Sequence, residues 1–206
     1  MHTVLTHPLV RHRVTLMRDI NTKPKQFREL VNEITEFLAI ESLRDLKTVE
    51  VPVTTPVAKT TGVRIKDSIV IVPILRAGMG MLDAMLHVLP YAKVGVLGMQ
   101  RNEQTAEPVP YYAKVPPAKG DEFAIVIDPM FATGGSAVDA VTQLKKLGYR
   151  KIIFLNLVSA PEGIANFEKN HPDVPVYTAA KDERLNSHYY IVPGLGDAGD
   201  RIFGTL

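Results

Sequence analysis

One acid and a run of small, hydroxylated residues lie together between Asp128 and Ser136. Thr133 and Ser136 offer hydroxyl donors, and Gly134 and Gly135 let the backbone approach a ligand without a Cβ in the way. Where such a loop opens a helix, its N–H groups and the helix dipole converge on one point, which suits a phosphate dianion. Because a phosphate would repel the Asp128 carboxylate, that side chain is expected to face a sugar diol or a magnesium ion.

The flanking residues place this loop between a strand and a helix. Residues 123–127 are continuously apolar, which predicts a buried parallel strand. From Ala137 apolar residues recur at helical spacing until Gly148. An alternative stays open at this point, in which the stretch is only a tight turn whose Asp128 and Ser136 cap the helix. The stretch matches neither G-x-x-x-x-G-K-[ST] nor G-x-G-x-x-G.

Two further stretches carry candidate ligand-binding residues. The apolar run 69–75 predicts a second buried strand, and Arg76 follows it, where open α/β sheets bind their ligands. A structural salt bridge would explain this arginine equally well. Near the C-terminus, three glycines surround Asp197, which in isolation favours an irregular turn. His188, in a charged loop, is expected to be a solvated side chain.

The remaining pattern predicts one α/β domain over residues 1–206. Further apolar runs at 94–99, 152–159 and 174–180 complete a mainly parallel sheet of about five strands. Residues 48–63 alternate but contain two prolines, which indicates an edge strand or irregular hairpin. Residues 10–19 show no clear period and are expected to wrap over the surface or over a partner subunit.

The composition favours small-molecule partners. Lys and Arg number 24 against 22 acids, so no broad basic field is expected for a nucleic acid or a membrane surface. The chain contains no cysteine, and no apolar run approaches the length of a membrane span. The first ten residues lack the pattern of a secretion signal, and a cytoplasmic location is therefore expected.

The wording of residues 126–137, VIDPMFATGGSA, resembles the phosphoribosyl-pyrophosphate (PRPP) loop of the type I phosphoribosyltransferases. Most of that superfamily has a second acid where this chain has Pro129, and this departure resembles the uracil phosphoribosyltransferases. The resemblance implies the type I phosphoribosyltransferase fold, in which helices flank a mainly parallel sheet. It also implies a flexible β-hairpin flap at about 100–113 and a C-terminal hood at about 181–206.

The resemblance also implies roles for individual residues. Asp128, Arg101 and Asp197 would be catalytic, and uracil would be bound by Ile191, Gly196, Asp197 and Ala198, largely through the backbone. Uracil presents an acceptor, a donor and an acceptor along one edge, which main-chain groups can read where glycine lets the chain approach. The implied PRPP-binding residues are Arg76, Arg101, Asp128, Pro129, Met130, Phe131, Ala132, Thr133, Gly134, Gly135, Ser136 and Asp197. In the flap, Asn102 and Gln104 stand where Asp and Glu are common.

The implied activity is the conversion of uracil and PRPP to UMP and diphosphate, a step of pyrimidine salvage. Mg²⁺ would be the cofactor, held mainly by PRPP without direct side-chain ligation. A homodimer or homotetramer is implied, with GTP as a candidate effector. The alternative from another class is a nucleotide-sensing, RNA-binding regulator on the same fold. The absence of tryptophan and the near-balanced charge disfavour that alternative.

Overall fold

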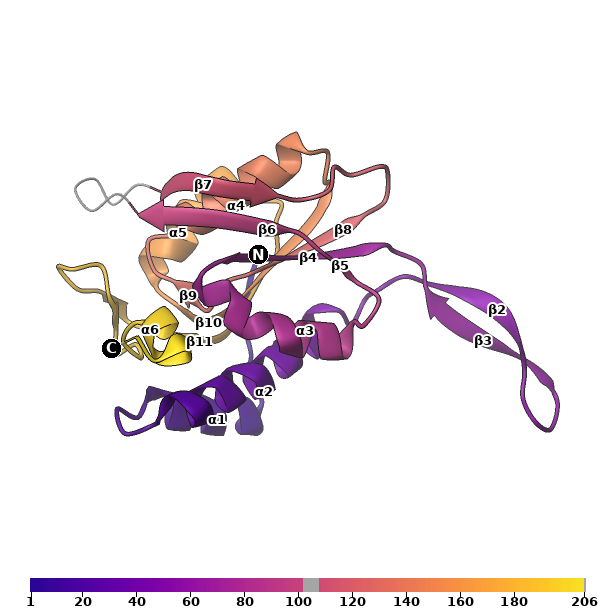
Figure 1. The fold of residues 1–206 in the computed structure, drawn as a ribbon, viewed down its shortest axis with the longest axis horizontal. Coiled ribbons are helices and arrows are strands. Elements are labelled where there is room, and N and C mark those ends of the chain that lie inside the picture. Colours follow the sequence, from indigo (N-terminus) through magenta and orange to yellow (C-terminus); the bar gives the residue numbers. More distant parts are fainter. Residues whose placement is uncertain (102–107, 206) are drawn as a thin grey trace.

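A mainly parallel sheet runs through the centre of the molecule (Figure 1). The structure, a computed structural model, describes residues 1–101 and 108–205, with only the backbone for residues 100, 101 and 108–110. The strand order is β1-β11-β10-β8-β4-β6-β7, with β5 beside β4 and β9 beside β10. All pairs in this order are parallel except β6 with β7. The bounds are β1 His2–Val4, β4 Ile69–Leu75, β5 Lys93–Val94, β6 Val96–Arg101, β7 Pro108–Lys114, β8 Phe123–Ile127, β9 Met130–Phe131, β10 Lys151–Ser159 and β11 Val176–Lys181.

Helices cover both faces of this sheet. One face packs against α1 (Pro8–Arg18), α2 (Pro24–Ser42), the 3₁₀ turn η1 (Ala77–Met81), α3 (Leu82–Val88) and α6 (Ala198–Phe203). The other face packs against α4 (Gly135–Lys146) and α5 (Pro161–Asn170). Successive residues of β4 and β8 therefore enter opposite cores, and both cores are apolar. This explains why these strands appear as continuous apolar runs, and the five predicted strands are confirmed.

The expectation that residues 10–19 have no regular period was wrong, because residues 10–18 belong to helix α1 and Asp19 is its C-cap. Its buried residues, Val10, Val14 and Met17, are spaced by four and three, which is a helical stripe. The charged and polar residues between them face solvent and obscure the stripe in the sequence. Within the described chain, no helix is long and apolar enough to cross a bilayer.

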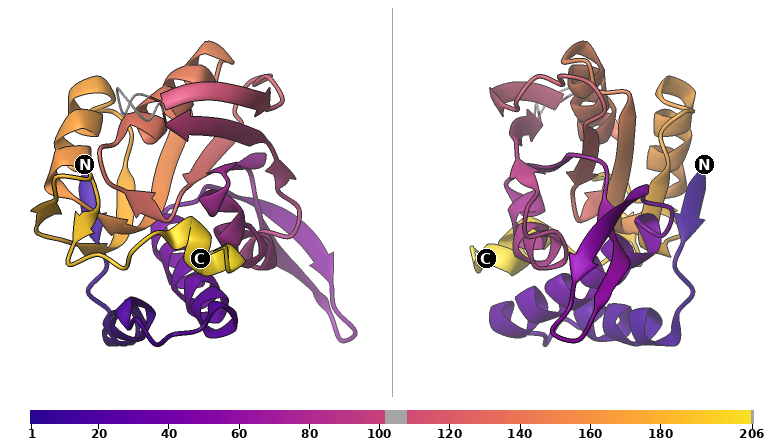
Figure 2. Two further views of the ribbon diagram at one scale, coloured as in Figure 1. Left: turned by 60° about the vertical axis from the view of Figure 1, so that its left-hand side comes forward. Right: turned by 90° about the vertical axis from the view of Figure 1, so that its right-hand side faces the viewer.

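The predicted hairpin consists of β2 (Thr48–Thr54) and β3 (Lys59–Ile65), which pair only with each other. It extends away from the sheet as a narrow arm (Figures 1 and 2). Several apolar side chains on it are exposed, among them Val53, Val57, Val63 and Ile65. The predicted flap corresponds to the β6–β7 hairpin, and its residues 102–107, including Asn102 and Gln104, lie outside the described residues.

The C-terminal segment forms a small cap of its own. β12 (Arg184–Leu185) and β13 (Ile191–Val192) pair antiparallel, and α6 follows. α6 packs against α2 and η1 (Figure 2). Because η1 comes directly after β4, this cap lies beside the carboxyl end of a central strand.

Candidate active site

The predicted stretches meet around a cavity of about 460 Å³. Three segments contribute to it, namely the turn after β4, the loop after β8 and the C-terminal cap. These are places where parallel α/β sheets bind ligands. The lining residues are Arg76, Ala77, Met130, Ala132, His188, Tyr189, Tyr190, Ile191, Gly196, Asp197, Ala198 and Gly199.

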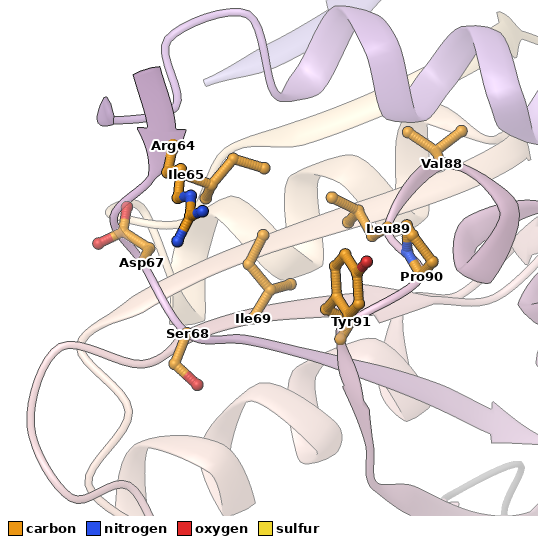
Figure 3. Close-up of a pocket in the computed structure, with 10 residues that line it drawn as sticks. Arg64, Ile65, Asp67, Ser68, Ile69, Val88, Leu89, Pro90 and Tyr91 are labelled. Atoms are coloured by element: carbon orange, nitrogen blue, oxygen red, sulfur yellow. The ribbon is translucent and has the colours of Figure 1, made fainter. Parts of the chain in front are cut away.

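A larger cavity of about 650 Å³ lies elsewhere, between the base of the β2–β3 hairpin and the end of α3 (Figure 3). It adjoins Ile69, the first residue of β4, and therefore the amino edge of the sheet. Its acid, Asp67, is paired with Lys151 at 2.8 Å. The smaller cavity is the better candidate site because it lies at the carboxyl edge, where the predicted ligand residues converge.

Asp128 follows β8 directly, with its Oδ1 3.5 Å from the backbone N–H of Met130. Burial raises the pKa of this carboxyl to about 7, opposed by the Met130 N–H and reinforced by the Asp197 carboxylate. The Asp197 carboxylate is therefore close enough to disfavour the charged form of Asp128. Helix α4 takes Gly134 as its N-cap, a residue with no side chain to cap with. Asp128 therefore does not cap α4, a role that the sequence had left open.

The raised pKa of Asp128 predicts a pH dependence of stability. The folded protein retains this proton between about pH 4, where an ordinary Asp ionises, and about pH 7. The stability contributed by the retained proton is present at low pH and is lost as the pH rises towards 7. The unfolding free energy, measured in urea at pH 5 and pH 8, should therefore fall more for the wild type than for Asp128→Asn. An equal fall in both proteins would contradict the raised pKa.

The loop from Pro129 to Ala132 alternates between the core and the cavity. Met130 and Ala132 line the cavity, whereas the Phe131 side chain packs edge-on against Phe154 and Phe167, with centroids 5.0 and 5.7 Å away. The Pro129 carbonyl accepts the N–H groups of Leu157 and Val158, both at 3.1 Å. Pro129 and Phe131 thus anchor the loop, and their side chains are not cavity residues. The predicted contact of these two residues with PRPP stays a prediction.

Residues 133–136 form the turn into α4. Gly134 has φ +81°, and a Cβ there would lie 2.7 Å from the Gly163 carbonyl oxygen, so only glycine fits. The Thr133 carbonyl accepts a hydrogen bond from Asn166 Nδ2 at 2.9 Å. Gly135 and Ser136 begin the helix. The first N–H groups of a helix have no partner inside it, and such groups can bind an anion.

Arg76 extends from the end of β4 beside the cap. Its guanidinium lies 3.5 Å from Asp200 and 5.8 Å from the centre of the Phe203 ring, and 62% of the side chain is exposed. A weak, exposed ion pair of this kind leaves the guanidinium able to turn towards an anion. Arg101 is the last residue of β6, and its side chain is not among those described.

The cap presents backbone to the cavity. Ile191 is 5% exposed, with its side chain in the core, and Gly196 has φ +82°. Asp197 caps α6, because its Oδ1 accepts the Asp200 N–H at 2.9 Å. Ala198 is the first residue of that helix, where the N–H has no intrahelical partner.

Sequence reasoning missed three residues of the cavity wall. His188 was expected to be only solvated, and Tyr189 and Tyr190 were not considered, yet all three line the cavity. Tyr189 has φ +61°, a conformation uncommon outside glycine. The sequence offered one indication that these residues line the cavity, namely their position inside the predicted hood.

Comparison with known proteins places this geometry in a family. Residues 4–205 match the family model described as "Uracil phosphoribosyltransferase". A uracil phosphoribosyltransferase of Campylobacter concisus is 51% identical over 203 residues, which cover 98% of each chain. The solved structure of the AQ2163 protein from Aquifex aeolicus is 38% identical, has a TM-score of 0.94 and matches over 98% of each chain.

A more distant structure shows the fold alone. An adenine phosphoribosyl transferase from Trypanosoma brucei, solved with AMP, pyrophosphate and ribose-5-phosphate, has a TM-score of 0.62 at 11% identity. The match covers 87% of this chain and 83% of the Trypanosoma brucei chain. The type I phosphoribosyltransferase fold expected from the sequence is thus confirmed. Since the family model spans nearly the whole chain, this chain belongs to the uracil phosphoribosyltransferase family.

Proposed function

We propose that this chain transfers the 5-phosphoribosyl group of PRPP to uracil, yielding UMP and diphosphate in pyrimidine salvage. The observation that carries the proposal is the cavity in which Arg76, the loop after Asp128 and the glycine-rich cap meet. Such a cavity can hold a phosphorylated sugar and a flat base side by side. Family membership supports the same substrates.

The phosphoribosyl group would contact both residues 133–136 and Asp128. The N–H groups and hydroxyls of residues 133–136 hold the 5′-phosphate at the start of α4. Asp128 accepts hydrogen bonds from the ribose hydroxyls and must be ionised to accept from both. Its pKa of about 7 in the free protein means that substrate binding near neutral pH draws the carboxyl to its charged form.

The reaction would be a displacement at the anomeric carbon through an oxocarbenium-like state, with no protein nucleophile. Arg76 would leave its weak ion pair with Asp200 and contact the departing diphosphate. The predicted contact of Arg101 with the same group would come from the flap. Closure of the flap, residues 100–113, would exclude water from the sugar cation. The protein then acts mainly by positioning two ligands and stabilising the leaving group.

Magnesium fits the donor chemistry of this site. Asp128 and Asp197 lie close enough for the second to raise the pKa of the first, and Mg²⁺ prefers such oxygen donors. We propose that the ion is held mainly by the diphosphate of PRPP. The Asp197 oxygen not used in capping α6 would then face PRPP or its metal. When bound, the ion neutralises the charge that develops on the diphosphate.

Base recognition would rest on the main chain. The backbone of Ile191 and of Gly196, Asp197 and Ala198 would read the acceptor–donor–acceptor edge of uracil. Cytosine reverses two of these positions, which leaves buried polar groups unpaired and costs far more than a small added substituent.

We also propose that the chain forms a homodimer or homotetramer. The β2–β3 arm exposes apolar residues, and Tyr91, which lies beside the larger cavity (Figure 3), is 99% exposed. Both features suit a subunit contact. Sedimentation should show a dimer or tetramer, and a monomer would contradict the proposal. GTP remains a candidate effector, to be tested by initial rates measured with and without it.

The activity is tested by supplying the purified protein with PRPP, Mg²⁺ and one of four bases: uracil, cytosine, hypoxanthine or orotate. We expect nucleotide formation with uracil and little or none with the other three. Equal use of uracil and cytosine would refute the proposed reading of the base edge. Preferred use of hypoxanthine or orotate would refute the proposed function.

A further inference from the structure

Two side chains outside the cavity form hydrogen bonds with the middle of the segment that would bind uracil. Gly194 lies between Ile191 and Gly196, which belong to the two parts of the proposed base site. Its N–H donates to Asp182 Oδ2 at 2.8 Å, and its carbonyl accepts from Arg18 Nη1 at 2.7 Å. The N–H and the carbonyl of Gly194 are therefore both hydrogen-bonded to side chains.

The two side chains that hold Gly194 also hold each other. Arg18 Nη1 donates to Asp182 Oδ2 at 2.8 Å, and Arg18 Nη2 donates to Asp182 Oδ1. The Asp182 side chain is 3% exposed and that of Arg18 is 23% exposed. A two-pronged, charge-assisted pair in this setting fixes geometry as well as adding energy.

The backbone at Gly194 has little freedom to adjust. Gly194 has φ +61°, and a Cβ there would lie 2.1 Å from the Ile191 carbonyl oxygen. Only glycine therefore fits this close approach to the Ile191 carbonyl. The segment depends on the clamp, defined here as Arg18 and Asp182, for its position.

A second arginine extends the attachment to the same place. Arg201 Nη1 donates to the carbonyls of Leu195 at 2.9 Å and Met17 at 2.8 Å. Its Nη2 donates to the Asp19 carbonyl at 2.7 Å, and the group lies 4.3 Å from the centre of the Phe27 ring. The end of α1 is therefore the anchor for residues 194 and 195.

We propose that Arg18 and Asp182 are positioning residues that set base specificity, an inference that rests on the proposed function. Neither residue lines the cavity. They act by holding the main-chain groups on both sides of Gly194 at the spacing that uracil requires. The phosphate loop is anchored separately, by β10 through Pro129 and by α5 through Asn166. Weakening the clamp should therefore impair binding of the base and leave binding of PRPP nearly unchanged.

The test compares Arg18→Lys and Asp182→Asn with the wild type. Lysine keeps the charge but loses the planar fork, and asparagine keeps the shape but loses the charge. We expect the KM for uracil to rise about ten- to a hundredfold and the preference for uracil over cytosine to fall about tenfold. The KM for PRPP should stay within about twofold. The double variant should be no more impaired than the more impaired of the two single variants, because both residues act through one clamp.

Arg13→Lys is the matched control, since Arg13 lies on the same helix and pairs with Glu33 away from the cap. It should leave both KM values unchanged. Equal losses for uracil and PRPP, or an unchanged preference over cytosine with a lowered Tm, would overturn the clamp's role. If Asp182→Asn does not fold, Arg18→Lys and Arg18→Gln decide the question by the same criteria. Failure of the wild type to form UMP would instead refute the proposed function.

Discussion

Replacing Asp128 with asparagine should lower kcat/KM for PRPP by about a hundredfold or more. The carboxylate is expected to accept from two ribose hydroxyls, and a hydrogen bond to a charged group contributes about 1.5–3 kcal/mol. Asparagine has nearly the same shape, so the fold should persist and uracil binding should change little. Steady-state kinetics with each substrate varied in turn would measure the effect.

Asp139→Asn provides the matched control for this change. Asp139 is on α4 and accepts a hydrogen bond from Gln143 of the same helix, and the variant should behave as the wild type. Unchanged kinetics in Asp128→Asn would remove the ligand role assigned to Asp128. Loss of activity in both variants would indicate that the effect is not specific to the site.

Replacing Ala198 with proline should weaken uracil binding about ten- to a hundredfold, because it removes the N–H donor that would pair with the base. The position tolerates proline in other respects. Ala198 is the first residue of α6, where proline is favoured. Asp197 before it has φ −83° and ψ 112°, an extended conformation compatible with a following proline. The KM for uracil and for 5-fluorouracil should rise together.

Ala198→Gly is the control, because it removes the side chain but keeps the N–H. Its KM for uracil should stay within a few-fold of the wild type. If both variants weaken uracil equally, packing of the Ala198 methyl group and not the N–H is responsible. If Ala198→Pro keeps the wild-type KM with an unchanged Tm, the Ala198 backbone does not read the base.

The central strands were predictable because both of their faces are buried. Strands β4 and β8 have no solvent face, so apolar residues run without interruption and their pattern admits few alternatives. Helix α1 was missed for the opposite reason. Its stripe of Val10, Val14 and Met17 is narrow and is separated by basic and polar residues. Arg18, on that helix, meets Asp182 across 164 positions, a contact that no local pattern can indicate.

The PRPP loop was predicted as one contiguous stretch, residues 128–136, and the structure places its successive side chains on different sides. Met130 and Phe131 form the short strand β9, so successive side chains point to opposite sides. Met130 therefore lines the cavity while Phe131 joins the aromatic core. The motif located the loop but could not specify this alternation. The Tyr189–Tyr190 wall depends on how the cap folds over the sheet, which is a tertiary property.

A crystal structure of the protein with bound UMP tests the central claim most directly. The account predicts the base in the cavity of about 460 Å³, with its edge hydrogen-bonded to the backbone of Ile191 and of residues 196–198. It predicts the phosphate on the N–H groups of residues 133–136 and the ribose hydroxyls on Asp128. UMP bound in the larger cavity beside Tyr91, or in the reverse orientation with its base on the 133–136 loop, would contradict it.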